Sequence, residues 1–248
     1  MSYLILGASS GLGRELANIL AQNSNNLIII SRDERDLKAI RSDLENKYKI
    51  SVKYFAFDAS SFEEVKNFLN SNLNLLNEIQ GVMFPIGMVE EQDEIINDML
   101  KSNRLIQANM GTVIYFLSKI FPIFLKKNHG VIVGFGSVSA AIGRDVNTVY
   151  AASKRGLESF FESLATTAVN SKIKIQFYTL GYLDSNLAYG MKLLLPKGSI
   201  NRLANIVYKN LKKNYKKIYY PSWWFLIITL IKVLPFSFAL TIYKFLKK

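Results

Sequence analysis

The chain has 248 residues, with 31 Lys and Arg against 19 Asp and Glu, and a net charge of +12. It contains no cysteine and a single histidine, His129, which excludes disulfides, a thiol nucleophile and a metal site built from cysteine and histidine; we predict no metal site. The length suits one α/β domain with a sizeable core. Since the first apolar segment begins at residue 3, no room is left for a signal peptide, and we expect a cytoplasmic protein.

Apolar runs and segments of helical periodicity alternate along the chain. Strands are expected near residues 3–6, 27–31, 51–57, 80–84, 130–135, 173–179 and 217–220. Helices are expected near residues 11–22, 33–48, 61–77, 101–127, 149–170 and 199–214. This alternation predicts an α/β protein with a Rossmann-type, doubly wound parallel sheet between two layers of helices, over residues 1–220. Ligands of such folds bind at the carboxyl ends of the strands.

A glycine-rich turn, residues 7–13, joins the first expected strand to the first expected helix. Strand, glycine-rich turn and helix form the context of a dinucleotide site, because glycines let the backbone approach the pyrophosphate. The helix N-terminus adds N–H groups and the positive end of the helix dipole. The residues predicted to contact the cofactor here are Gly7, Ser9, Ser10, Gly11, Leu12 and Gly13.

The residues after the second expected strand indicate which nicotinamide cofactor is preferred. An NAD site usually carries an acidic residue about 20 positions past the glycines, on the ribose 2′-hydroxyl. Here Arg32 occupies that place, and its guanidinium can pair with a 2′-phosphate. We therefore expect NADPH to be preferred over NADH, with Asp33 next to Arg32 keeping the preference from being absolute.

Tyr150 and Lys154 are four residues apart and share one face of an expected helix. A free phenol has a pKa near 10, and a lysine cation within ~4–6 Å lowers it, which makes the phenol a usable acid or base near neutral pH. Ser137 ends an apolar strand, where its hydroxyl can donate to a carbonyl or developing alkoxide oxygen. The three residues together predict hydride-transfer chemistry on a carbonyl group. Alone, the pair also fits a half-buried helix with a surface lysine.

With these motifs the chain resembles a single-domain short-chain dehydrogenase/reductase over about residues 1–220. The resemblance implies that Tyr150 gives a proton to the substrate oxygen and that Lys154 holds the nicotinamide ribose. The implied catalytic tetrad is Asn109, Ser137, Tyr150 and Lys154, with Asn109 positioning a water. The implied cofactor contacts, besides the glycine turn and the tetrad, are Asp58 on the adenine side, Gly87, Gly181 and Ser185. A homodimer or homotetramer through the helices near 101–127 and 149–170 is also implied.

The chain departs from the family pattern in three places. The family's Asn-Asn-Ala-Gly after the fourth strand is replaced by residues 84–87, Phe-Pro-Ile-Gly, so side-chain hydrogen bonds that brace the central strands are lost. The family's Pro-Gly after the sixth strand is Leu180-Gly181 here, and Ser185 stands where a threonine often meets the nicotinamide carboxamide. No tetrad residue is lost.

The last quarter of the chain is both basic and apolar. No Asp or Glu follows Asp184, and residues 185–248 hold twelve Lys or Arg, so the preceding part balances at 19 basic and 19 acidic side chains. The run from Trp223 to Ile231 carries no charge. A tryptophan pair, apolar faces and flanking lysines suit a bilayer interface, where anionic lipids attract each lysine by ~1 kcal/mol.

We interpret residues 221–248 as two short amphipathic or re-entrant helices broken at Pro235, holding the protein on the inner face of the membrane. One alternative is a single spanning helix, which needs ~20 apolar residues and would place Lys232 in mid-span. The other is a buried tail that covers the active site or a dimer partner. The apolar stretch 183–198 is expected to be a lid over the substrate or else a plain surface loop.

These patterns predict an NADPH-dependent reductase that converts a ketone to a secondary alcohol on a lipid or lipid-linked substrate. One alternative is a soluble 3-oxoacyl-thioester reductase whose basic face docks an acidic acyl carrier protein. A second is a catalytically silent scaffold that binds NADPH. Nucleic-acid binding is not expected, because the aromatic residues form one apolar block and do not alternate with the lysines.

Overall fold

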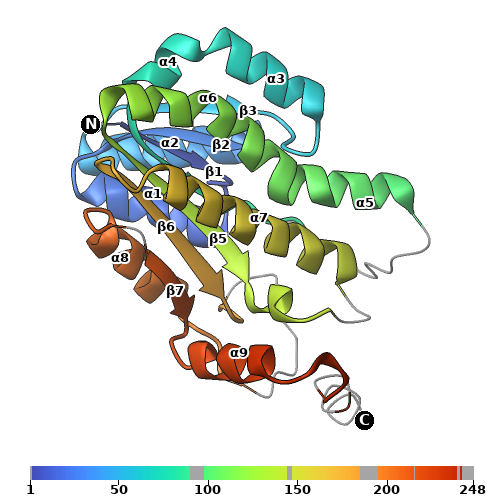
Figure 1. The fold of residues 1–248 in the computed structure, drawn as a ribbon. Helices are drawn as coiled ribbons and strands as arrows, with labels where there is room; N and C mark the ends of the chain where they lie inside the picture. The colour runs from blue at the N-terminus through green and yellow to red at the C-terminus, as the bar shows by residue number, and fades with distance from the viewer. Residues whose placement is uncertain are drawn as a thin grey trace.

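The computed structural model describes residues 2–89, 98–143, 147–184, 195–214, 216–238 and 241. Its strands form a single parallel sheet in the order β3-β2-β1-β4-β5-β6-β7 (Figure 1). The strand bounds are β1 Ser2–Leu6, β2 Asn26–Ser31, β3 Val52–Ala56, β4 Ile79–Phe84, β5 Gly130–Ser137, β6 Ile173–Leu180 and β7 Lys216–Tyr220. Two halves wind outward from the β1–β4 pair, so the predicted doubly wound Rossmann-type fold is confirmed.

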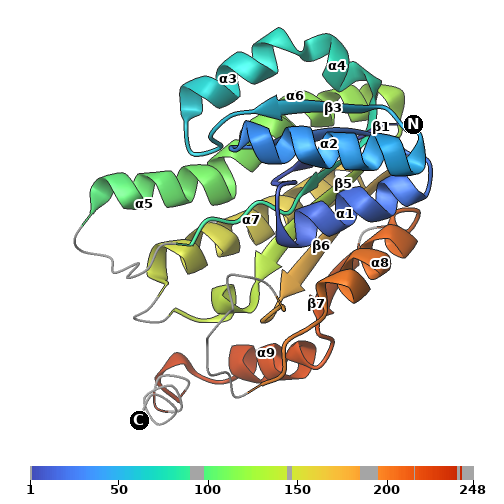
Figure 2. The same ribbon diagram turned by 180° about the vertical axis from the view of Figure 1, so that it is seen from behind.

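Helices cover both faces of the sheet (Figures 1 and 2). One face carries α1 Gly11–Gln22, α2 Glu34–Tyr48 and α8 Ile200–Asn210. The other carries α3 Phe62–Ser71, α4 Leu73–Glu78, α6 Thr112–Lys127 and α7 Thr148–Thr167, with α5 Met99–Ile106 leading into α6. A further helix, α9 Trp224–Val233, lies beyond the carboxyl ends of β5 and β6.

Both faces of the central strands are buried, which is why they read as continuous apolar runs in the sequence. Leu4 and Leu6 point into the core below α3, α6 and α7, whereas Ile5 points into the core below α1, α2 and α8. All three side chains are at most 1% exposed. The two cores fix the sheet, and thereby the carboxyl edge where the candidate site lies.

Two helices differ from their predicted form. The predicted helix 61–77 is divided at Asn72, whose φ of −121° is not helical and whose side chain donates to the Phe68 carbonyl at 2.9 Å. The predicted helix 101–127 begins earlier, where Asp98 accepts from the Leu100 and Lys101 N–H groups, and it contains a π-helical turn. Asparagine and aspartate compete for backbone hydrogen bonds, which explains both changes.

Among the described residues, one helix is long and apolar enough to cross a membrane, namely the continuous 29-residue helix Met99–Lys127, which contains an 18-residue window with a mean hydropathy of 1.4. Its residues Phe116, Ile120 and Phe124 are 0% exposed and belong to the core. This is the pattern of a core helix packed on a sheet. The C-terminal α9 has 10 residues, about 15 Å of helix, which is shorter than the roughly 30 Å hydrocarbon core of a bilayer.

Candidate active site

The glycine-rich turn between β1 and α1 is closely packed on one side and open on the other. A Cβ at Gly13 would lie 1.9 Å from the Gly7 carbonyl oxygen, so α1 can start against the turn only because residue 13 is glycine. Gly7 and Gly11 have φ of +98° and +49°, which favours glycine at both. Around Gly11, apart from its own chain neighbours and helix backbone, no atom of the described residues lies within 4 Å of the added Cβ. A ligand can therefore approach the backbone there.

The start of α1 keeps hydrogen-bonding groups for a ligand. Ser10 is the N-cap residue, but its side chain does not cap the helix. The N–H groups of the first turn and the Ser10 hydroxyl therefore remain for an anion, which the helix dipole also favours. Leu12 is 8% exposed and packs in the core, so its predicted cofactor contact can come only from its backbone N–H.

At the end of β2 one arginine is exposed to solvent, and the carboxylate beside it is ion-paired and hydrogen-bonded within α2. Arg32 is exposed. Asp33 caps α2, accepting from the Arg35 and Asp36 N–H groups at 2.8 and 3.3 Å, and it pairs with the Arg35 guanidinium at 3.1 Å. The Arg35 side chain, and then the two backbone N–H groups, hold the pKa of Asp33 below its usual value. The Ser31 hydroxyl is buried at this strand end and has no hydrogen-bond partner among the described residues.

Asp58 follows β3 and lies at the same edge of the sheet. Its Oδ1 accepts from the Ser60 N–H and hydroxyl, both at 2.8 Å. Its Oδ2 lies 3.6 Å from the Arg104 guanidinium, which reaches over from α5. The adenine-side role that the resemblance implies for Asp58 stays a prediction, and any adenine there would also meet Arg104.

Asn109 lies in the π-helical turn Gln107–Gly111, between α5 and α6. Its side chain is 0% exposed, accepts from the Met88 N–H at 2.7 Å and donates to the Met88 carbonyl at 2.9 Å. Single π turns in helices occur frequently at functional sites. This one ties the helix to the segment after β4, and that segment contains Ile86 and Gly87.

Lys154, on α7, lies at the centre of the site with its ammonium group fully enclosed. Its Nζ donates to the Ile86 carbonyl at 3.1 Å and to the Phe135 carbonyl at 3.2 Å. A Cβ added to Gly87 would lie 3.9 Å from Nζ. Burial lowers the pKa of Lys154 to about 8, because the charged form loses its water. The side chain is thus held between the ends of β4 and β5.

Tyr150 and Ser137 complete the arrangement. Tyr150 is half-buried one turn before Lys154, and the Lys154 Nζ lies 5.9 Å from the Tyr150 ring centroid. Ser137 ends β5, and its Oγ accepts from the Ser139 N–H at 3.2 Å and the Ser139 hydroxyl at 2.7 Å. Since Oγ already accepts twice, the Ser137 proton is left to donate elsewhere, as a substrate oxygen requires.

Gly181 follows β6, and its N–H donates to the Tyr220 carbonyl at 2.8 Å. A Cβ at this position would lie 1.8 Å from Nε1 of Trp224, so the α9 indole packs directly on the glycine. Ser185 and residues 185–194 of the predicted lid lie outside the described residues. The two ends of the predicted lid are joined: Asp184 N–H donates to the Gly198 carbonyl at 3.0 Å.

Within the described part of the chain, no group of three or more His, Asp or Glu side chains could hold a metal ion. The predicted site residues that the structure places at the carboxyl edge of the sheet come from the turn after β1, from the segments after β2, β3, β4, β5 and β6, and, for Tyr150 and Lys154, from α7. This is the edge at which open α/β sheets bind their ligands.

The model of the short chain dehydrogenase family matches residues 2–192. The chain belongs to the short-chain dehydrogenase family. It is therefore an oxidoreductase that acts on CH–OH or C=O groups, and its family binds NAD(P) cofactors. The glycine turn, the uncapped start of α1 and the unpartnered Ser31 hydroxyl fit the phosphates and ribose of such a cofactor.

The chain is 25% identical over 89% of its length to "11-beta-hydroxysteroid dehydrogenase-like 2" of Arabidopsis thaliana, covering 73% of that protein. It is 27% identical over 73% of its length to a "Very-long-chain 3-oxoacyl-CoA reductase" of Debaryomyces hansenii, covering 54% of that protein. A short-chain dehydrogenase from Sphingobium yanoikuyae in complex with NADPH superimposes with a TM-score of 0.79 at 21% identity, over 89% of this chain and 87% of that one. The last likeness shows the fold.

Three contacts at the site were not predicted from the sequence. They are the Arg104–Asp58 pair, the packing of Trp224 on Gly181, and an ion pair between Lys232 and Glu158 at 3.7 Å. Each joins residues more than 40 positions apart, so no local pattern encodes it. In the sequence the tryptophan pair indicates a bilayer interface, with a buried tail over the active site as an alternative, but no pattern identifies Gly181 as the contact of Trp224.

Proposed function

We propose that the protein uses NADPH to reduce the keto group of a lipid or lipid-linked substrate at a membrane surface. The observation that carries the chemistry is the enclosed Lys154 ammonium one helical turn from Tyr150. When bound, the cofactor supplies the hydride. The proposal rests on what the side chains around that cofactor can do.

In this proposal each side chain has a separate task. The Ser137 Oγ accepts two hydrogen bonds from Ser139, so the Ser137 hydroxyl can still donate its own proton. It donates to the substrate carbonyl oxygen and orients it. The Tyr150 hydroxyl gives its proton to the same oxygen as negative charge develops there. The Lys154 cation favours the phenolate that is left behind. Asn109 keeps the segment after β4, and thus the Ile86 carbonyl that holds Lys154, in place.

The surroundings of Arg32 support a preference for NADPH. The guanidinium is exposed at the end of β2, where the adenosine ribose of a Rossmann fold lies. The neighbouring Asp33 carboxylate is already used by α2 and Arg35, so it neither accepts from a ribose 2′-hydroxyl nor repels a 2′-phosphate strongly. The Ser31 hydroxyl, which has no hydrogen-bond partner in the part of the chain that the structure describes, adds a second donor at the same strand end.

Arg32→Asp is expected to reverse the cofactor preference. The ratio of kcat/KM for NADPH to that for NADH falls by about 100-fold, because a charge-assisted pair with the 2′-phosphate is replaced by repulsion. The same charge change at Arg41, whose guanidinium pairs with Glu45 on the outer side of α2, serves as the control and leaves the ratio unchanged. An unchanged ratio in Arg32→Asp would make Arg32 a bystander.

The outer face of α9 supports the membrane part of the proposal. Phe225, Leu226, Leu230 and Val233 are 53%, 71%, 64% and 77% exposed, and they form one side of the helix. Past the break at Leu234 and Pro235, Phe236 and Phe238 are 60% and 64% exposed. A contiguous apolar face of this kind beside lysines suits the interfacial layer of a bilayer.

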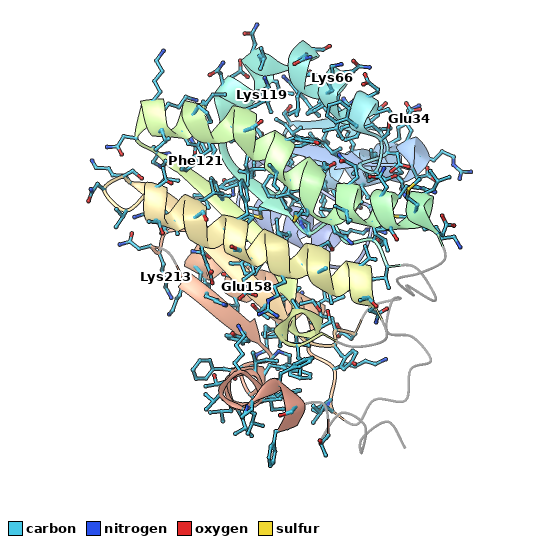
Figure 3. The ribbon with its side chains drawn as sticks, turned by 45° about the vertical axis from the view of Figure 1, so that its right-hand side comes forward. Glu34, Lys66, Lys119, Phe121, Glu158 and Lys213 are labelled. Atoms are coloured by element: carbon cyan, nitrogen blue, oxygen red, sulfur yellow. The ribbon has the colours of Figure 1, made fainter. Side chains whose placement is uncertain are left out.

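Some of the lysines of residues 185–248 form ion pairs within the protein. Lys217 of β7 forms a close ion pair with Glu158 of α7 and lies 3.3 Å from Glu162. Lys232 of α9 lies 3.7 Å from the same Glu158, which is labelled on α7 in Figure 3. Attraction to anionic lipid therefore depends on the other tail lysines, and insertion depends on the apolar face.

Leu226→Gln combined with Leu230→Gln is expected to release the protein from anionic vesicles. Each leucine contributes roughly 1.5–3 kcal/mol when fully buried, so the vesicle partition coefficient falls by at least about tenfold. Cosedimentation of the full chain with phosphatidylglycerol-containing vesicles measures it. Val169→Gln, which removes a 74% exposed apolar side chain just after α7, is the matched control. Equal partition of all three proteins contradicts the membrane proposal.

A second candidate function is a soluble 3-oxoacyl-thioester reductase. It is supported by the names of relatives, among them the yeast very-long-chain 3-oxoacyl-CoA reductase. Turnover of a 3-oxoacyl thioester in solution, at a rate that vesicles and the leucine substitutions leave unchanged, would favour it. A scaffold that binds NADPH without turnover is a third possibility, and Tyr150→Phe distinguishes it by leaving the biological effect intact.

A further inference from the structure

The inner face of α9 contacts the segments after β5 and β6 and the helix α7. Trp224 packs on Gly181 at the end of β6, and α9 lies against the short 3₁₀ turn Val138–Ala141, which begins just after Ser137. Lys232 pairs with Glu158, one turn after Lys154 on α7. In Figure 1 the helix lies beyond the carboxyl ends of β5 and β6. The apolar outer face and the site are therefore two sides of one helix.

Trp224 is the central contact of this helix. It is 9% exposed, and its ring stacks on that of Trp223 at 4.7 Å and lies 6.3 Å from that of Tyr182. Its Nε1 is buried without a hydrogen-bond partner within the described part of the chain. An unpaired buried N–H opposes burial, so the indole is held on Gly181 by packing alone.

The packing of α9 against the rest of the protein, its seated position, is consequently weak. Apart from Trp224, Ile228 is the buried side chain of α9, at 3% exposure. Two buried side chains, an edge-to-face ring contact between Phe225 and Tyr219, and one partly exposed ion pair must offset the ordering of a 10-residue helix. Short segments with few buried contacts open locally more easily than the core. A ligand that favours the seated helix will shift this equilibrium.

We propose that α9 couples lipid docking to cofactor affinity, with Trp224 as the positioning residue that holds Gly181 in the conformation that binds NADPH. The inference rests on the proposed function and adds a form of regulation to it. Lipid on the outer face favours the seated helix, and the seated helix fixes the loop after β6. Two ligands that favour one state strengthen each other's binding by the same factor.

The chain offers a built-in reporter, because Trp223 and Trp224 are its only tryptophans. In full-length Trp223→Phe, all tryptophan emission comes from Trp224. NADPH bound beside Gly181 is expected to quench this emission by energy transfer from the Trp224 indole to the nicotinamide, which then emits in turn. Calorimetric titration of the same protein gives the Kd for NADPH, with and without vesicles of phosphatidylcholine and phosphatidylglycerol.

Vesicles are expected to lower the Kd for NADPH by about tenfold, within the usual range of coupling between sites. Saturating NADPH should raise the vesicle partition coefficient by the same factor. Trp224→Ala is expected to keep most of its vesicle binding, since the outer face is unchanged, and to lose the vesicle effect on the Kd. Trp224→Phe should restore part of it.

Gly181→Ala gives an independent variant, because its methyl group would lie 1.8 Å from the Trp224 Nε1 and displace the indole without changing α9 itself. It should reproduce the loss of coupling. Leu230→Gln is the opposite control: it weakens vesicle binding and keeps the Kd measured without lipid.

Vesicle binding with an unchanged Kd for NADPH overturns the coupling and leaves the proposed function standing. An equal vesicle effect in Trp224→Ala overturns the role of Trp224. Absence of NADPH binding under every condition overturns the proposed function itself, and this inference with it.

Discussion

Tyr150→Phe is expected to lower ketone turnover by about 10³-fold, within the range that a positioned general acid contributes. The substitution removes one hydroxyl from a half-buried ring and leaves the Lys154 contacts with Ile86 and Phe135 in place. The Kd for NADPH therefore stays nearly unchanged. Steady-state turnover and calorimetry on the same preparation measure the two effects separately.

The matched control is Tyr48→Phe. The Tyr48 hydroxyl donates to Asn18 Oδ1 at 2.8 Å, on the outer side of α1 and far from Lys154. Loss of this phenol costs a hydrogen bond and leaves turnover unchanged. If Tyr150→Phe turns over as fast as the parent, Tyr150 is not the proton donor.

Lys154→Met is expected to change the pH dependence of stability in the cofactor-free protein. Burial lowers the pKa of Lys154 to about 8 from a usual 10.5. Below pH 8 the lysine is protonated in both the folded and unfolded states, and the folded state bears the full desolvation cost. Between these pKa values the unfolded state binds more protons, so this cost disappears as the pH rises.

The cost corresponds to about 3 kcal/mol, at roughly 1.4 kcal/mol per pKa unit. The stability of Lys154→Met relative to the parent should therefore fall by about that amount between about pH 7 and pH 10.5. Urea unfolding at each pH measures it, and Lys119→Met, an exposed lysine on α6, is the control. A difference that does not vary with pH would contradict the enclosed position of Lys154. Activity should be lost in this variant at every pH.

The sequence predicted the fold and the strand edge because both depend on local patterns. Apolar runs that end in glycine, serine or aspartate marked the strands, and their alternation with helical segments predicted a doubly wound parallel sheet. The family match over residues 2–192 confirms the family, and the structure confirms the doubly wound sheet. The division at Asn72 and the π turn around Asn109 were not predicted, because each depends on one side chain bonding to a backbone group.

The candidate site was predicted residue by residue, and its roles stay predictions. The structure brings Lys154 to the ends of β4 and β5 and places Tyr150 beside it. The sequence could not show that the Asp33 carboxylate is occupied by hydrogen bonds at the start of α2, since that depends on the geometry of the helix cap. The sequence also could not show that Trp224 packs on Gly181, since 42 intervening residues separate the two and only the packing of α9 brings them together.

The most direct test of the account follows deuterium from NADPH labelled at nicotinamide C4 into product. The full chain, on phosphatidylglycerol-containing vesicles, is given a long-chain 3-oxoacyl ester and a steroid ketone in turn, and the alcohols are analysed by mass spectrometry. Deuterium is expected on the new carbinol carbon with at least one of these ketones, and none above background with Tyr150→Phe. NADPH binding without labelled alcohol from either ketone, or equal label in the Tyr150→Phe reaction, would contradict it.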